Sequence, residues 1–276
     1  EISMTIFNNY LAVDWSANSK PKIGADSIWL AWLSNTCELS FFNPRTRFDA
    51  LDLIKRLLKE SDGRVLAGFD FPFGYPKAFF DDLGLVKWSD FWAELFERVK
   101  DSANNNNNRF EVANYFNSLF PNSGPFWGHP MPNNGRYINI PFKKPVGYGC
   151  FLPNEKRSIE ALIKSTKTVW QLNGAGSVGG QALLGIPIIE SLRRSVSTSI
   201  WPFESHISKV VCAEIYPSMY KLENTERIKD ANQVKAVVKR LHALDVKGEL
   251  EQIMSIPSKL KGSECTHEGW ILGAVS

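Results

Sequence analysis

Short apolar runs that end in an acid are the clearest pattern in the N-terminal third of the chain. Two of them end in Asp14 and Asp70, and both are short enough to be buried strands rather than helices. Between them, apolar residues at helical spacing predict one helix. The predicted elements, in chain order, are strands at 10–15, 26–33 and 38–42, a helix at 49–60 and a strand at 65–70. This order predicts a β-β-β-α-β unit of an α/β protein.

The pattern changes between residues 72 and 208, where aromatic residues, prolines and asparagines crowd together. We interpret 72–208 as one long, mostly helical or irregular insertion within a single domain that spans 1–276. Helices are expected in it near 88–100, 109–119, 159–166 and 181–194, and the asparagine run 104–108 is interpreted as a solvated loop. The strand pattern returns at 209–217, and helices are predicted at 230–244 and 263–275.

Composition narrows the class of protein. The chain has 276 residues, 43% of them hydrophobic, which is enough for a substantial core. It has no apolar run of about 18 residues, so no membrane span is expected. The four cysteines are scattered without a CxxC pair, which favours reduced thiols in a cytoplasmic protein. A net charge of +3 does not by itself indicate a nucleic-acid-binding surface.

Three carboxylates, Asp14, Asp70 and Glu214, each lie at or near the end of a predicted strand. Functional groups gather at strand ends in open α/β sheets. Clustered carboxylates repel one another, and Mg²⁺ or Mn²⁺ relieves that repulsion with oxygen ligands. Two such ions about 3.5–4 Å apart support phosphodiester hydrolysis. The simpler alternative is that each acid only caps a helix or begins a turn.

A second pair of acids lies near the C-terminus. Glu264 and Glu268 are spaced four apart, which on the predicted last helix places them on one face. Their repulsion favours a nearby cation or basic group. The alternative is a solvated helix face with acids near its N-terminal end.

Several segments resemble an uncharacterised bacterial family of predicted ribonuclease H-like nucleases. The residues that carry the resemblance are 12–16, 68–74, 124–128, 171–185 and 213–217, which together span nearly the whole chain. The resemblance implies a ribonuclease H-like mixed sheet in which Asp14, Asp70 and Glu268, with Glu264 as alternate, bind metal. Relatives tend to carry aspartate followed by alanine on the last helix, whereas Glu268 precedes a glycine here, so the geometry of the third ligand departs from the family pattern.

Candidate substrate contacts lie in the long insertion. Gly174, Gly176 and Gly179 match the GxGxxG spacing, but the motif lies deep in the insertion and Glu190 comes too early to be the ribose-binding acid of a dinucleotide site. Backbone amides at the start of the following helix are a more modest candidate for binding phosphate; otherwise the glycines permit a tight turn. Lys143 and Lys144 are candidates for contacting a polyanion.

The leading hypothesis is a metal-dependent phosphodiester hydrolase that acts on nucleic acid or a nucleotide. In it Asp14, Asp70, Glu214 and Glu268 form the catalytic set, with Glu214 orienting water or completing a metal shell. One alternative is an actin-like nucleotide phosphotransferase, which normally needs two related domains. The other is a binding module for nucleic acid or another ligand that has lost catalysis.

Overall fold

The computed structural model describes residues 5–223, 225–256 and 262–274. Six strands form one mixed sheet in the order β3-β2-β1-β4-β6-β5. The strands are β1 (Asn9–Asp14), β2 (Trp29–Leu33), β3 (Leu39–Phe42), β4 (Val65–Phe69), β5 (Thr198–Trp201) and β6 (Val210–Glu214). β2 is antiparallel to β1 and β3, whereas β1, β4, β6 and β5 run parallel. The predicted α/β class is therefore confirmed.

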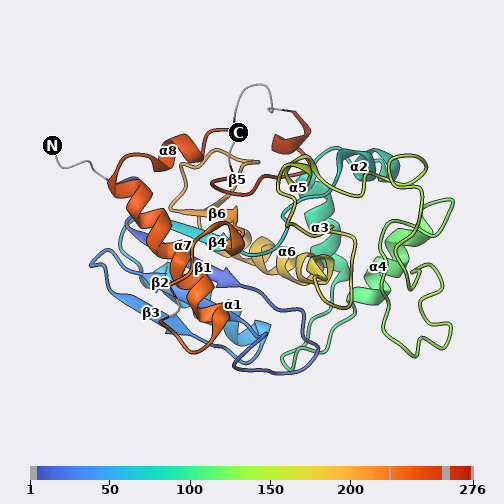
Figure 1. Cartoon of the computed structure of the whole chain (residues 1–276), viewed down its shortest axis with the longest axis horizontal. Coiled ribbons are helices and arrows are strands. Elements are labelled where there is room, and N and C mark those ends of the chain that lie inside the picture. The colour runs from blue at the N-terminus through green and yellow to red at the C-terminus, as the bar shows by residue number, and fades with distance from the viewer. Residues whose placement is uncertain (1–4, 224, 257–261, 275–276) are drawn as a thin grey trace.

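Eight α-helices surround this sheet in the described part of the chain. They are α1 (Arg47–Glu60), α2 (Lys77–Leu83), α3 (Trp88–Arg98), α4 (Arg109–Ser118), α5 (Ser158–Leu162), α6 (Val178–Ser195), α7 (Lys229–Val246) and α8 (Leu250–Ile253). Helices α2, α4 and α5 lie beside the sheet rather than over its centre (Figure 1).

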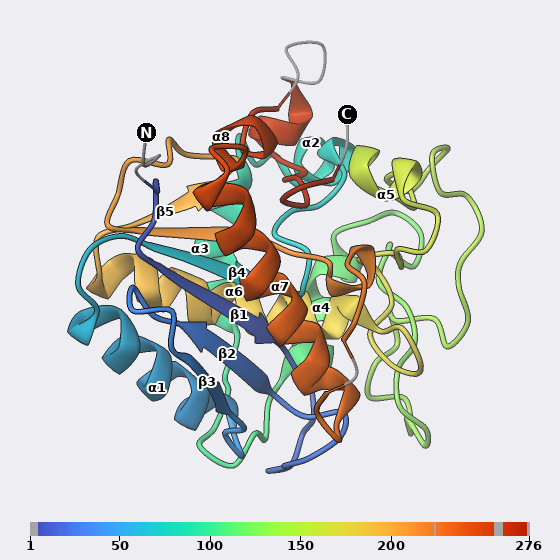
Figure 2. The same cartoon turned by 60° about the vertical axis from the view of Figure 1, so that its left-hand side comes forward.

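The two faces of the sheet pack against different helices because side chains alternate along each strand. On β1, Tyr10 and Ala12 join a core with Val234 and Val238 of α7. The alternate positions of β1 face a second core, which contains the buried residues of α1 and α6. Figure 2 shows α7 lying across its face of the sheet. Asp14 continues the alternation on the face covered by α7.

The segment 72–208 contributes to the sheet as well as to its surroundings. Strand β5 lies within this range and pairs in parallel with β6 at the sheet edge. Helix α6, which leads into β5, buries one face against the sheet. Four helices expected in this segment are present as α3 to α6, although α5 is shorter than predicted.

The prediction of a final helix at 263–275 is wrong for its described part. Only a single 3-10 turn forms, at Ser263–Cys265. The chain leaves helical geometry at Thr266, and three residues later Gly269 has a φ of 73°, which suits glycine. Ile271 forms an isolated parallel bridge with Glu214, so tertiary pairing at the sheet replaces the expected helix.

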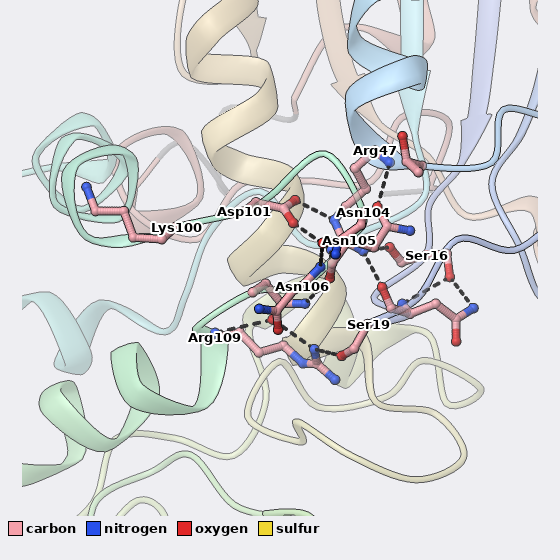
Figure 3. Close-up of polar contacts among 12 residues, drawn as sticks. Ser16, Ser19, Arg47, Lys100, Asp101, Asn104, Asn105, Asn106 and Arg109 are labelled. Atoms are coloured by element: carbon pink, nitrogen blue, oxygen red, sulfur yellow. Dashed lines mark hydrogen bonds and ion pairs between the residues drawn. The ribbon is translucent and has the colours of Figure 1, made fainter.

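The asparagine run 104–108 is not a purely solvated loop. Asn105 is 2% exposed and has a φ of 67°. Its side-chain oxygen accepts a hydrogen bond from the Arg47 backbone amide at 2.9 Å. The Arg47 guanidinium donates to Asp101 and to the carbonyls of Ser16 and Asn18. The asparagine loop therefore holds the segment that follows β1 in place (Figure 3).

Candidate functional site

Asp14 and Asp70 lie side by side at the carboxyl ends of two neighbouring parallel strands. Val13 pairs with Phe69 in the register of β1 and β4, and the Asp70 amide donates to the Val13 carbonyl at 2.9 Å. Both acids are half-buried. Within the described chain, no group donates a hydrogen bond to either carboxylate. These are the unpartnered acids of the sheet edge.

Burial and mutual repulsion both favour the protonated forms of this pair. Burial, and then the negative charge of Glu214, raises the pKa of Asp70 to about 7. Burial also raises the pKa of Asp14 well above its ordinary value, with further contributions from Asp70, Asp230 and Asp26. Strongly raised carboxyl pKa values next to a cavity are typical of functional sites.

Asp14 lies in the wall of a cavity of about 620 Å³. This volume falls in the range of small-molecule binding sites. Besides Asp14, the lining includes Asp26, Arg109 and Asp230, and the remaining side chains are mostly short and polar: Ser16, Asn18, Ser19, Ser27, Asn173, Ser177 and Gln181. Asp70 borders a much smaller neighbouring cavity, of about 40 Å³.

Four separate segments bring this lining together, and one of them is the start of α4, which supplies Arg109. The loop after β1 supplies Ser16 to Ser19, and the Gln181 side-chain amide anchors it by donating to the Trp15 carbonyl at 2.6 Å. The N-terminal turn of α7 supplies Asp230, which accepts a hydrogen bond from the Asp26 amide at 2.7 Å. The glycine-rich loop before α6 closes another side.

The chain matches no known protein family, curated protein or solved structure in the comparisons made.

Glu214 lies at the end of β6, next to the pair, but its carboxylate is fully engaged. Arg157 donates to both of its oxygens, at 2.6 and 2.8 Å, and the Phe73 amide donates at 3.0 Å. Glu214 and Arg157 are both buried. Glu214 also pairs in register with Phe69, so it faces the side of the sheet opposite Asp14. This arrangement suits a structural ion pair.

The structure does not bring Glu264 and Glu268 to Asp14. The Glu268 carboxylate accepts hydrogen bonds from the backbone amides of Ser158, at 2.6 Å, and Lys77, at 3.5 Å. Glu264 lies in the 3-10 turn and is not part of the cavity lining. No three His, Cys, Asp or Glu side chains among the described residues are grouped so that they could hold a metal. The four acids assigned to metal from sequence are therefore not a preformed cage.

Some of the predicted substrate-binding residues lie at the cavity, and others do not. Gly174 and Gly176 line the cavity with Asp14, and both have positive φ, 89° and 79°. Gly179 has a packing role, because a Cβ there would lie 2.3 Å from the Val169 carbonyl oxygen. Lys143 and Lys144 are exposed and do not line the cavity.

Sequence reasoning missed three charged residues of the cavity: Asp26, Arg109 and Asp230. Asp230 had a detectable signal, since it begins the helix that follows the last acid-ending strand. Arg109 begins α4, far from Asp14 in sequence, and no local pattern marks it.

The described part of the chain also has no helix long and apolar enough to cross a membrane.

Proposed function

We propose that this protein is a divalent-metal-dependent hydrolase of phosphate esters in a nucleic acid or nucleotide. One observation carries the proposal: Asp14, unpartnered and with a raised pKa, borders a polar cavity beside a second unpartnered acid, Asp70. A carboxyl group that is costly to ionise and receives no hydrogen bond from the protein is suited to bind a cation or to take up a proton from a ligand.

We further propose that the sheet is of the ribonuclease H-like type. Three antiparallel strands followed by parallel strands in the order β3-β2-β1-β4-β6 support this assignment. The position of Asp14 at the end of the central first strand supports it too, together with the motif resemblance. The edge strand β5 is an addition to the predicted β-β-β-α-β core.

The carboxylates at this site fit a cation that binds few protein ligands. Mg²⁺ is commonly held by one or two carboxylates, and water and substrate phosphates complete its shell. Asp14 and Asp70 supply such a pair, and Asp26 and Asp230 add negative potential around Asp14. A bound divalent cation would polarise the phosphoryl group and promote ionisation of water there.

The chain's own residues would then position the cation and the substrate. Asp14 is fixed by the β1 backbone, so its carboxylate has a defined position at the cavity wall. Burial and Glu214 raise the pKa of Asp70 to about 7 in the metal-free protein, and a bound cation would favour its ionised form.

Asp14→Asn tests the proposal. Wild type should gain thermal stability with Mn²⁺, about 2.7 kcal/mol at a hundredfold excess over the dissociation constant. It should also hydrolyse bis(p-nitrophenyl) phosphate or single-stranded oligonucleotides. The variant should lose both responses and remain folded, because the amide is nearly isosteric with the acid. Asp52→Asn, at an exposed position of α1, is the matched control and should behave like wild type.

Two outcomes would contradict the proposal. Equal stabilisation of wild type and Asp14→Asn by metal would mean that Asp14 does not bind it. Turnover of nucleoside triphosphates without diester hydrolysis would favour the phosphotransferase alternative.

A further inference from the structure

Arg109 is a buried cation that faces the cavity without a counter-ion. It is 8% exposed, and no carboxylate in the described chain forms an ion pair with it. Its Nε atom is buried and has no hydrogen-bond partner. A buried arginine is normally paired, because an uncompensated charge is expensive to remove from water.

The other buried arginines of the molecule show the contrast. Arg47 is bidentate with Asp101, and Arg157 is shared between Glu160 and Glu214. Arg109 instead donates through one terminal nitrogen to the neutral oxygens of Ser19 and Asn107, at 3.0 and 2.9 Å. Figure 3 shows this side chain reaching Ser19 beside the asparagine loop.

Charges of both signs surround Arg109, because the cavity wall also carries Asp14, Asp26 and Asp230. Burial, and then the positive charge of Arg47, lowers the pKa of Arg109 to about 10, so the guanidinium remains charged at neutral pH. Asp101, Tyr137 and Glu111 act in the opposite direction on this pKa, so an anion would relieve the cost of burial and the repulsion from Arg47. Arginine is suited to phosphate because its planar fork donates two parallel hydrogen bonds.

The glycine-rich loop lies near Arg109 on the same cavity. A Cβ at Gly180, in the first turn of α6, would lie 3.4 Å from the Arg109 Nε. The first amides of α6 are already used, since Val178, Gly179 and Gly180 donate to backbone carbonyls. Within the described residues, the amides of Gly174 and Gly176 donate no hydrogen bond. Free donors therefore belong to the loop and to Arg109 rather than to the helix end.

The other residues that line the cavity indicate which chemical group is attached to the anion. Hydroxyl and amide side chains predominate in it, and its one aromatic residue in the described chain, Trp15, is 1% exposed. No aromatic face is therefore available to stack on a base. Short polar side chains are suited to the hydroxyl groups of a sugar.

We propose that the cavity binds a sugar phosphate unit, with Arg109 as the residue that anchors its phosphate in the cavity that Asp14 also lines. This inference specifies which part of its substrate the proposed hydrolase would bind. It rests on the proposed function only because it takes this cavity as the reaction site.

Calorimetric titration with inorganic phosphate and with ribose 5-phosphate, with and without Mg²⁺, tests this binding. Wild type should bind both, and ribose 5-phosphate should bind more tightly. Arg109→Gln should weaken both affinities roughly tenfold or more, the size expected for a lost charged hydrogen bond. Arg56→Gln, at an exposed position of α1, is the matched control and should bind like wild type.

Arg109→Lys keeps the test decisive if the glutamine variant does not fold. It retains the charge but loses the fork, so phosphate affinity should fall severalfold. Unchanged affinity in a folded Arg109 variant would overturn the proposal, as would AMP binding far more tightly than ribose 5-phosphate. Arg109-dependent phosphate binding without metal-dependent hydrolysis would support this inference and refute the proposed function. Hydrolysis with an unchanged KM in Arg109→Gln would do the reverse.

Discussion

Arg157 donates hydrogen bonds to both carboxylate oxygens of Glu214, from two terminal nitrogens at 2.6 and 2.8 Å. The same guanidinium also binds Glu160 and the Glu268 carbonyl. This contact separates the acids of the sheet edge into two kinds. Glu214 is neutralised by a buried arginine, whereas Asp14 and Asp70 have no such partner.

Glu214→Gln should therefore destabilise the protein without removing its response to metal. The substitution leaves Arg157 with one carboxylate instead of two, and breaking a buried pair costs up to about 3–5 kcal/mol. Urea unfolding with and without Mn²⁺ measures both effects. Glu155→Gln removes the more exposed pair with Lys144 and should cost no more than about 1 kcal/mol. A stable Glu214→Gln protein without a metal response would instead assign Glu214 to the reaction site.

The stability of the metal-free protein should fall as pH rises from about 4 to about 7. The folded-state pKa of Asp70, about 7, lies above its ordinary value of 3.8, so in this window the folded chain holds a proton that the unfolded chain has lost. The loss is at most about 1.4 kcal/mol per pH unit for one group. Chemical unfolding in EDTA across this range should show a shallower slope for Asp70→Asn.

Mg²⁺ should reduce the same loss in wild type, because a cation favours the ionised carboxylates. Identical slopes in wild type and Asp70→Asn would show that Asp70 does not hold the raised pKa.

Gly179→Ala should destabilise the protein, although alanine is the better helix former. A Cβ at this position would lie 2.3 Å from the Val169 carbonyl oxygen and 2.7 Å from that of Gln171. Such overpacking typically costs about 1–3 kcal/mol. Gly180→Ala, where the nearest atom is 3.1 Å away, should cost less. Thermal melts of the two variants give the comparison, and a stabilised Gly179→Ala would contradict the close packing of the loop against 169–171.

The local pattern of apolar and polar residues was sufficient to predict most of the strands and helices. Strands β1, β4 and β6 are continuous apolar runs, because both faces of a central parallel sheet are buried, and each ends at or just before an acid. Helices α1 and α7 follow from apolar residues at helical spacing. The final helix failed because Gly269 interrupts it and the sheet edge pairs with Ile271 instead.

The sequence by itself determined that Asp14 and Asp70 each end a buried strand, since period and hydrophobicity are local properties of the chain. Only the tertiary structure decided which acids remain unpartnered. Arg157, from a distant loop, neutralises Glu214, and backbone amides bind Glu268. Asp230 and Arg109 reach the cavity only because α7 and α4 are packed beside the loop after β1. Charge pairing depends on distances in space, and no sequence period encodes the distance between residues that lie far apart along the chain.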